Sequence, residues 1–358
     1  MSKTQGIPVV TPGEAKARIE LIMSSYDPDS GEHPTPVFLH GPPGVGKSSI
    51  VHQIAAERKM TLLDLRLVTT DAVDMRGMPY KSILVDGTAI MDFASSGLLP
   101  RVETDGERGI LFLDEFPQAT TLVQNAASEL LLDRRIGSQY TLPDGWYIVA
   151  AGNRRMDRAG TQEIPNHLRN RVCHLEVYAH AQSWVTYAKQ RQLHDGLIKF
   201  IEQDGKQLFQ FTGDQLAFAT PRSMEFVSRV LKHADRQAAA GEKVDKKVLW
   251  DVVAGLVGDA AMSQMRAVIE ANQGIPTYAE IVSAPASADV PTHSGQLFAL
   301  VESIATQSVK KDIVKLSVYL DRLPAESARI AVSKVRMKHP TATEVKEFKA
   351  LYDRVLNS

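Results

Sequence analysis

The sequence has almost no cysteine. Cys173 is the one cysteine in 358 residues, so no disulfide can form within the chain, and a reducing compartment is expected. Residues 1–10 lack the basic and apolar regions of a signal peptide. No apolar run approaches the ~18 residues that a membrane span needs. We therefore expect a cytoplasmic protein that makes no use of a membrane.

The chain also lacks an excess of charge of either sign. Its 41 Lys and Arg residues balance 42 Asp and Glu residues, for a formal net charge of −1. This balance excludes a globally basic nucleic-acid-binding chain but leaves room for a local basic patch. A hydrophobic content of 44% is ordinary for a globular protein, and the length predicts two or three domains.

One glycine-rich stretch carries the strongest chemical signal. It follows the apolar residues 36–39 and leads, from Ser49 onward, into residues with helical spacing. The pattern G-x-x-x-x-G-K-[ST] between a strand and a helix is typical of a phosphate-binding loop. Its members are Gly41, Pro42, Pro43, Gly44, Val45, Gly46, Lys47 and Ser48.

The residue types of this loop suit a nucleoside triphosphate. Glycines let backbone N–H groups wrap around phosphates, and the helix N-terminus that follows favours anions. Lys47 is expected to reach the β- and γ-phosphates, and the Ser48 hydroxyl to bind Mg²⁺. A chance glycine-rich turn is the alternative, and the flanking strand and helix disfavour it.

Residues 109–115 form a mostly apolar run that ends in Asp114 and Glu115. Such a run predicts a central parallel strand whose carboxyl end faces a ligand. Asp114 is expected to hold Mg²⁺ with Ser48, and Glu115 to polarise the attacking water as a general base. An acidic pair after a strand is usually a solvated turn, but a phosphate loop in the same chain makes it a signal for hydrolysis.

Asn153 and two arginines are weaker candidates. Asn153 follows a strand over residues 146–151 and could reach the γ-phosphate or the water, although Asn after Gly is more often a turn residue. Arg169 and Arg171 precede the strand at 173–177, where solvated charge is the plain interpretation.

A third arginine lies at a predicted helix start. Thr220 and Pro221 predict an N-cap and first helical residue, which puts Arg222 in the first turn. A cation there opposes the helix dipole, and this small cost suggests an anionic partner.

The pattern of elements predicts an α/β domain followed by helices. Strands and helices alternate up to residue 177, which favours a mostly parallel sheet, and the chain is helical from residue 180 onward. Asp86-Gly87 predicts a hairpin with arms 82–85 and 88–93, and residues 135–147 predict another that turns at Pro143-Asp144-Gly145. The expected domains are 1–178, 179–240 and 241–358, with a linker near 283–293.

Together these residues resemble an AAA+ ATPase, and within it the MoxR-like group of the helix-2-insert clade, over roughly residues 5–235. Residues 41–48 are similar to Walker A, 110–115 to Walker B and Asn153 to sensor 1. Gly160-Thr161, Ile164-Pro165 and Leu168 through Arg171 resemble the segment that ends in the arginine finger. Residues 220–222 are similar to sensor 2, and the two hairpins lie where the clade has insertions. Val172 replaces the usual Phe after the finger, and Arg169 is a rival finger.

The resemblance implies a three-layer αβα domain with a mostly parallel five-stranded sheet, a helical lid and a further helical region. It implies ATP and Mg²⁺ as cofactors and a ring of six subunits, in which Arg171 reaches a neighbour's γ-phosphate and Arg222 senses it from the lid. It also implies a protein client and a von Willebrand factor A-type partner.

Two other functions stay open. The pairs Arg134-Arg135 and Arg154-Arg155, with Arg158, would suit a nucleic-acid motor or loader, although solvated charge explains them more simply. A small-molecule kinase is disfavoured by the acidic pair at 114–115 and by the lid with its sensor arginine.

Overall fold

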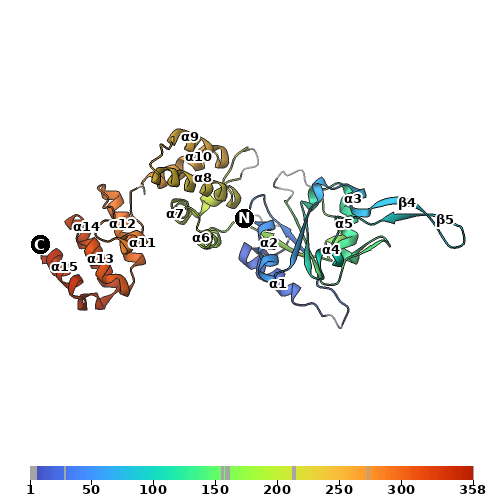
Figure 1. The fold of residues 1–358 in the computed structure, drawn as a ribbon, viewed down its shortest axis with the longest axis horizontal. Helices are drawn as coiled ribbons and strands as arrows, with labels where there is room; N and C mark the ends of the chain where they lie inside the picture. Colours follow the sequence, from blue (N-terminus) through green and yellow to red (C-terminus); the bar gives the residue numbers. More distant parts are fainter. Residues whose placement is uncertain are drawn as a thin grey trace. The chain divides into compact units, whose positions relative to one another are not determined.

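The structure is a computed structural model that describes residues 6–27, 30–154, 157, 162–211, 215–271 and 274–357. The chain divides into two compact units, Met1–Met262 and Ser263–Ser358 (Figure 1). The three-part division expected at residues 178 and 240 stays a prediction. Within the described ranges, no helix is long and apolar enough to cross a membrane.

A six-stranded parallel sheet organises the first unit. Its strand order is β1-β10-β2-β9-β6-β3. The strands are β1 (Val9–Val10), β2 (Val37–His40), β3 (Thr61–Arg66), β6 (Gly109–Asp114), β9 (Trp146–Gly152) and β10 (Cys173–Val177). Four of them are the strands expected at residues 36–39, 109–115, 146–151 and 173–177. The sheet has six strands rather than the expected five, because the two-residue strand β1 pairs in parallel with β10 at its edge.

Helices cover both faces of this sheet. Successive side chains of a strand point to opposite faces. Val37 and Leu39 accordingly share a core with α1 (Pro12–Met23) and α2 (Lys47–Arg58), whereas Phe38 joins the core beneath α5 (Thr121–Asp133). The first unit therefore contains the three-layer αβα arrangement that the sequence predicted.

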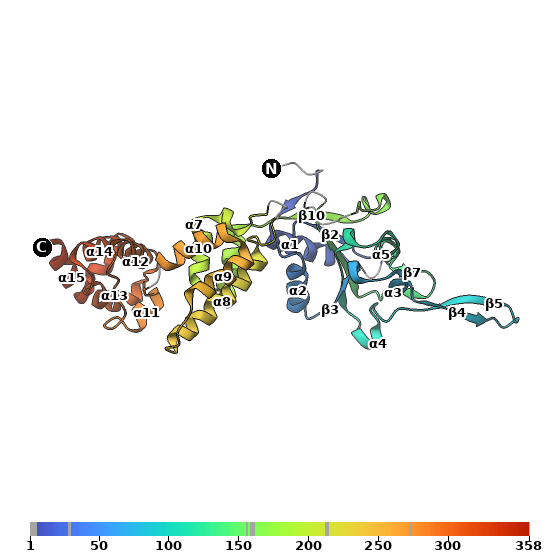
Figure 2. The same ribbon diagram turned by 90° about the horizontal axis from the view of Figure 1, so that it is seen from above.

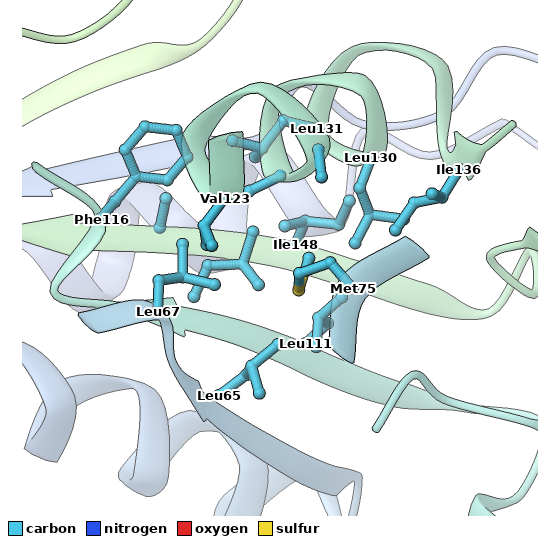
Figure 3. Close-up of a cluster of buried hydrophobic side chains, with 14 of the residues drawn as sticks. Leu65, Leu67, Met75, Leu111, Phe116, Val123, Leu130, Leu131, Ile136 and Ile148 are labelled. Atoms are coloured by element: carbon cyan, nitrogen blue, oxygen red, sulfur yellow. The ribbon is translucent and has the colours of Figure 1, made fainter. Parts of the chain in front are cut away.

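The core beneath α5 holds the functional edge of the sheet in place. Figure 3 shows side chains of α5, among them Val123 and Leu130, packed over Leu111 and Ile148 of the central strands. Phe116, which follows the acidic pair, is fully buried in the same cluster. The turn after β6 is thus anchored by burial of apolar surface, at ~25 cal/mol per Å².

Two helices of the first unit begin with a capping box, one of them at the helix start predicted at Thr220. Thr11 forms a capping box with Glu14 at the start of α1. Thr220 forms one with Ser223 at the start of α8 (Pro221–Ala239).

The first predicted hairpin is present with Gly87 in its turn, but its arms are β4 (Met78–Ile83), which begins four residues earlier than expected, and β5 (Ala89–Ala94). Both views show it extending away from the sheet and its covering helices (Figures 1 and 2). The second hairpin differs from expectation. It pairs β7 (Arg135–Ile136) with β8 (Tyr140–Thr141) and turns at Gly137, whose N–H donates to the Glu129 carboxylate. Pro143-Asp144-Gly145 instead connects β8 to β9.

Short helices connect the strands of the first unit, and longer ones follow the sheet. The connecting elements are η1 (Leu67–Thr69), α3 (Ala72–Arg76), α4 (Val102–Asp105), η2 (Phe116–Gln118) and η4 (Asn166–Leu168). After β10 come α6 (Ala181–Gln190), α7 (Asp195–Gln203), η5 (Gly205–Leu208), α8, α9 (Lys246–Val257) and α10 (Asp259–Ala271), which crosses the boundary between the units.

The second unit is helical and has its own core, in which Leu300, Val332 and Phe348 are fully buried. Its elements are α11 (Tyr278–Ser283), α12 (Ser294–Gln307), η6 (Lys310–Asp312), α13 (Ile313–Leu320), α14 (Ala325–Lys338), η7 (Pro340–Glu344) and α15 (Lys346–Asn357).

The single cysteine begins β10. Cys173 is partly buried, and burial raises the pKa of its thiol. The thiol therefore carries little thiolate at neutral pH, which makes it a weak nucleophile.

Candidate nucleotide site

Residues from three strand ends meet at the carboxyl edge of the sheet. His40 of β2 is in register with Gly152 of β9, and Arg66 of β3 with Asp114 of β6, so these strands end at the same level. Two hydrogen bonds join the loops that follow. Lys47 Nζ donates to Asn153 Oδ1 at 3.0 Å, and Ser48 Oγ to Asp114 Oδ2 at 3.0 Å.

The glycine-rich loop ends at a helix N-terminus that no side chain caps. Gly46, with φ of 102°, is the N-cap of α2 and has no side chain to offer to the first N–H groups of that helix. Free N–H groups and the helix dipole together favour a phosphate at this position. The left-handed φ explains why glycine stands there.

Lys47 is buried within the loop that it serves. Its ammonium donates to the carbonyl oxygens of Gly41 and Pro42, at 2.7 and 3.0 Å, besides Asn153. Burial is the main cause that lowers the pKa of Lys47 to about 8, while the Asp114 charge acts in the opposite direction. The negative charge of bound phosphates would stabilise the protonated form of Lys47 and so oppose the effect of burial on its pKa.

The start of α8 packs against the same loop. A Cβ on Gly44 would lie 2.8 Å from Thr220 Oγ1, so only glycine permits this approach. The Arg222 N–H donates to the Gly44 carbonyl at 3.3 Å. The Arg222 side chain is exposed, and it is near enough for its charge to lower the pKa of Lys47.

Glu115 adopts an unusual backbone conformation. Its φ of 57° and ψ of 33° are left-handed, which is uncommon for a residue with a side chain and is typical of functional turns. Its N–H donates to Asp114 Oδ1 at 2.8 Å. The end of β9 closes on this turn, because a Cβ on Gly152 would lie 2.1 Å from Pro117 Cδ.

Ser48 and Asp114 fit a magnesium ion. A hydroxyl and a carboxylate oxygen already converge to 3.0 Å, and both are ligands that Mg²⁺ prefers. The described residues contain no cluster of three or more His, Cys, Asp or Glu side chains that would form a complete metal site. A metal here would complete its coordination with phosphate oxygens and water, as Mg²⁺ commonly does.

A cavity of about 330 Å³ opens beside α2. Its walls come from α1, α2, α6, η5 and α8 and include the apolar side chains of Ile50, Trp184 and Leu208. Gln53 and Tyr187 add polar groups. An apolar cleft with a few polar groups is suited to a nucleoside. Sequence reasoning missed it, because its walls come from distant segments and have no local pattern.

Arg171 lies at the opposite edge of the sheet. It precedes Cys173, which is in register with Val37 at the beginning of β2. Four residues of strand then separate that level from Gly41, about 13 Å at the usual rise. The Arg171 side chain is exposed, and no described residue forms an ion pair with it. Arg171 therefore points away from its own loop.

Its rival Arg169 is partly engaged. The Arg169 guanidinium contacts the Glu163 carboxylate and the Ile164 carbonyl oxygen, each at 3.4 Å. Gly160 and Thr161, which contributed to the resemblance, lie outside the described residues.

Arg135 is exposed, as solvated charge predicts, whereas Arg134 and Arg154 bind protein oxygens. Arg154 donates to Asp157 and, at 2.6 Å, to Glu176, and both carboxylates are buried. Arg134 donates to the Pro143 carbonyl oxygen at 2.8 Å. Arg155 and Arg158 lie outside the described residues. Arg154 follows Asn153 directly, so its ion pairs anchor the loop that carries that candidate.

Residues 37–176 match the model of the ATPase family associated with various cellular activities (AAA). They form an AAA domain. No curated protein sequence matches the chain. The match spans Lys47, Asp114, Glu115, Asn153 and Arg171, whereas Arg222 lies beyond it.

Among solved structures, the chain is similar to the RuvB Holliday junction branch migration motor of Thermotoga maritima. The two are 18% identical, with a TM-score of 0.41, over 82% of this chain and 81% of that chain. NtrX from Brucella abortus is 16% identical, with a TM-score of 0.36, over 90% of this chain and 64% of that chain. Values this low carry no argument about function. The parallel sheet and the family match give an AAA+ α/β fold.

Proposed function

We propose that this chain hydrolyses ATP at sites shared between the subunits of a ring and uses the energy to remodel a protein or a protein complex. One observation carries the proposal. Lys47 and Ser48 of the phosphate loop are hydrogen-bonded to Asn153 and Asp114 at the ends of two other strands. A passive phosphate loop needs neither contact.

Each candidate residue has a role in this proposal. Loop residues 41–49 and the α2 N-terminus hold the phosphates, and Lys47 neutralises the β- and γ-phosphates. Glu115 polarises the attacking water, which Asn153 orients. Mg²⁺, held by Ser48 and Asp114, would neutralise charge that develops on the phosphate oxygens.

Two arginines complete the site from outside the sheet. Arg222 contacts the γ-phosphate from α8, which already packs on the loop at Gly44. Arg171 acts on the nucleotide of a neighbouring subunit, which suits its exposed position at the far edge of the sheet. Hydrolysis would release both contacts and allow the lid helices to move, a change of the kind that nucleotide switches use.

The substitution Glu115→Gln tests the chemistry. ATP should still bind with an affinity within about twofold of wild type, while turnover falls by about 10²–10⁴, the usual contribution of a general base. Glu103→Gln, on the exposed side of α4, is the matched control and should leave turnover unchanged. A Glu115→Gln protein with normal turnover would remove Glu115 from the mechanism.

A comparison of Arg171→Ala with Arg169→Ala tests the shared site. Arginine fingers contribute ~10³–10⁵ in rate in other nucleotide hydrolases, so Arg171→Ala should lose at least ~10³ and Arg169→Ala little. Light scattering with ATP should report an assembly larger than one subunit. A protein that stays monomeric at micromolar concentration while hydrolysing ATP normally would contradict this part.

The nature of the work done is proposed from the MoxR-like resemblance. The partner would be a von Willebrand factor A-type protein, and hairpin β4–β5 would contact a protein client. The hairpin suits that role because it exposes large apolar side chains, among them Ile83, Val85 and Met91. A von Willebrand A-type protein encoded by a neighbouring gene should bind the chain and change its ATPase rate.

A nucleic-acid motor and a small-molecule kinase remain alternatives with less support. Arg134 and Arg154 donate to protein oxygens, and Arg154 lies in a partly buried ion-pair network. ATPase stimulation by DNA that falls steeply with salt would favour the motor. Phosphoryl transfer to an acceptor other than water would favour the kinase.

A further inference from the structure

A row of hydrogen-bonded histidines links the phosphate loop to the segment that carries Arg171. His40 ends β2 and directly precedes Gly41. His40 Nε2 lies 2.8 Å from Nδ1 of His174 on β10. His174 Nε2 lies 2.9 Å from the carbonyl oxygen of Arg169. Neither histidine has a role in the proposed chemistry.

The geometry restricts where the hydrogens lie. A carbonyl oxygen only accepts, so His174 Nε2 must carry a hydrogen and donate it to Arg169. One hydrogen lies between the two rings, so both rings cannot be charged at once. Burial, followed by the charges of His174 and Lys47, lowers the pKa of His40 to about 3, so His40 is neutral at neutral pH.

Packed aromatic rings hold the histidines from behind. Phe38 stacks on His40 with ring centroids 4.6 Å apart, and its centroid lies 5.9 Å from that of His174. Phe116, which directly follows Glu115, meets the edge of Phe38 at 5.5 Å. Phe38 and Phe116 are fully buried, so neither histidine can shift far without disturbing a close-packed core.

The Arg169 carbonyl is a sensitive point in its segment. The backbone turns twice there, with Arg169 N–H donating to Asn166 and Arg171 N–H to Leu168. The direction of the Arg169 carbonyl sets the plane of the peptide that joins Arg169 to residue 170. Arg171 follows this peptide, two residues before Cys173 enters the sheet. A hydrogen-bond donor on a sheet strand, such as His174, can therefore fix the backbone from which the Arg171 side chain projects.

We propose that His174 is a positioning residue that, braced by His40, fixes the Arg169 carbonyl and so orients Arg171 toward the neighbouring subunit. The inference rests on the proposed role of Arg171 in a shared site. It also means that His40 and His174 connect the phosphate loop of a subunit rigidly to the segment that carries Arg171 of the same subunit. A displacement of the loop would then reach the adjacent nucleotide through two imidazole rings.

Two substitutions of His174 test the inference. His174→Leu removes the donor, and because small misplacements of a catalytic group are costly, turnover should fall about tenfold or more. Affinity for ATP should stay within about twofold, since the subunit's own loop is intact. His174→Gln offers an amide N–H to the same carbonyl and should recover turnover to within about threefold of wild type. His233→Leu, exposed on α8, is the control for loss of a histidine.

Mixed assemblies separate a finger defect from a fold defect. Lys47→Ala subunits cannot use their own site but present an intact Arg171. Mixed with His174→Leu subunits, they should restore turnover at the sites they adjoin, as they should for Arg171→Ala subunits. The inference would be overturned if His174→Leu had wild-type turnover. It would also be overturned if Lys47→Ala subunits restored turnover to Arg171→Ala subunits but not to His174→Leu subunits. No restoration of Arg171→Ala would instead overturn the shared site itself.

Discussion

At the scale of single residues, Lys47 has the environment with the most direct functional consequence. The lysine of a phosphate loop is required as a cation, and burial lowers its pKa to about 8 in the free protein. Burial therefore makes nucleotide affinity depend on pH in a range that is easily measured.

Affinity for ATP should fall as pH rises through 8. Below that value Lys47 is protonated and binds the anion, and above it the free protein must first take up a proton. With a pKa of about 8, the Kd should rise about eightfold between pH 7.5 and pH 9. Titration calorimetry at several pH values measures this. Lys47→Arg keeps its charge throughout and should show a flat profile. A Kd that does not change with pH in the wild-type protein would mean that the pKa of Lys47 is not lowered.

A second residue-scale prediction concerns Gly152. A Cβ at this position would lie 2.1 Å from Pro117 Cδ, so Gly152→Ala should overpack the turn that holds Glu115. We expect a loss of ~1–3 kcal/mol in the free energy of unfolding and lower turnover. Gly255→Ala is the matched control. Gly255 lies in helix α9 with open space around it, so alanine should stabilise by ~0.5–1 kcal/mol. Denaturant titration measures the free energy of unfolding of both variants. A change of the same sign in both would contradict the prediction.

Residue patterns identify candidate site residues but not the contacts between them. The loop at 41–48 and the pair Asp114-Glu115 are contiguous, so their chemistry is legible in sequence order. The contact of Lys47 with Asn153 joins residues 106 positions apart. The ion pairs of Arg154 and the bond between His40 and His174 depend on strand register. No single-sequence pattern specifies which strands become neighbours.

At the scale of elements, helix starts were predicted better than hairpin turns. Capping boxes are short, and their hydrogen bonds involve four consecutive residues, so the helix start at Thr220 was identified from sequence. Strand β1 has two residues and no periodicity to detect. The turn of the second hairpin is set by Glu129, whose carboxylate accepts the Gly137 N–H from eight residues away.

The capping box of α8 yields an element-scale prediction. Thr220→Ala removes the acceptor for the Ser223 N–H and should lower the free energy of unfolding by ~1 kcal/mol. Thr220→Ser keeps the hydroxyl and should cost only a few tenths. Because α8 packs on Gly44, the alanine variant should also weaken ATP binding. Equal unfolding midpoints for both variants would show that the cap contributes nothing.

At the scale of the whole molecule, the chain contains two units with separate cores. The core of Ser263–Ser358 includes Phe348, which is fully buried, and it shares no residue with the cores around the sheet. Separate hydrophobic cores favour separate cooperative unfolding transitions.

Calorimetry should resolve the two units. Phe348→Ala should lower the transition of the second unit alone, by ~3–5 kcal/mol in the free energy of unfolding. ATP with Mg²⁺ should raise the transition of Met1–Met262 alone, by ~2.7 kcal/mol at one hundred times the Kd. A single transition that both perturbations move together would mean that the units fold as one.

Because the chain has one cysteine, a fluorescent dye can be attached at a single chosen position to follow the protein during ATP hydrolysis. Cys173 is partly buried at the start of β10, and its raised pKa makes it slow to react. Cys173→Ser would give a chain free of cysteine, into which one thiol can be placed at will. Val85 at the tip of hairpin β4–β5 is 109% exposed and packs against nothing that a dye would displace. A fluorophore at that tip would report, in real time, whether the hairpin meets another surface during each round of hydrolysis.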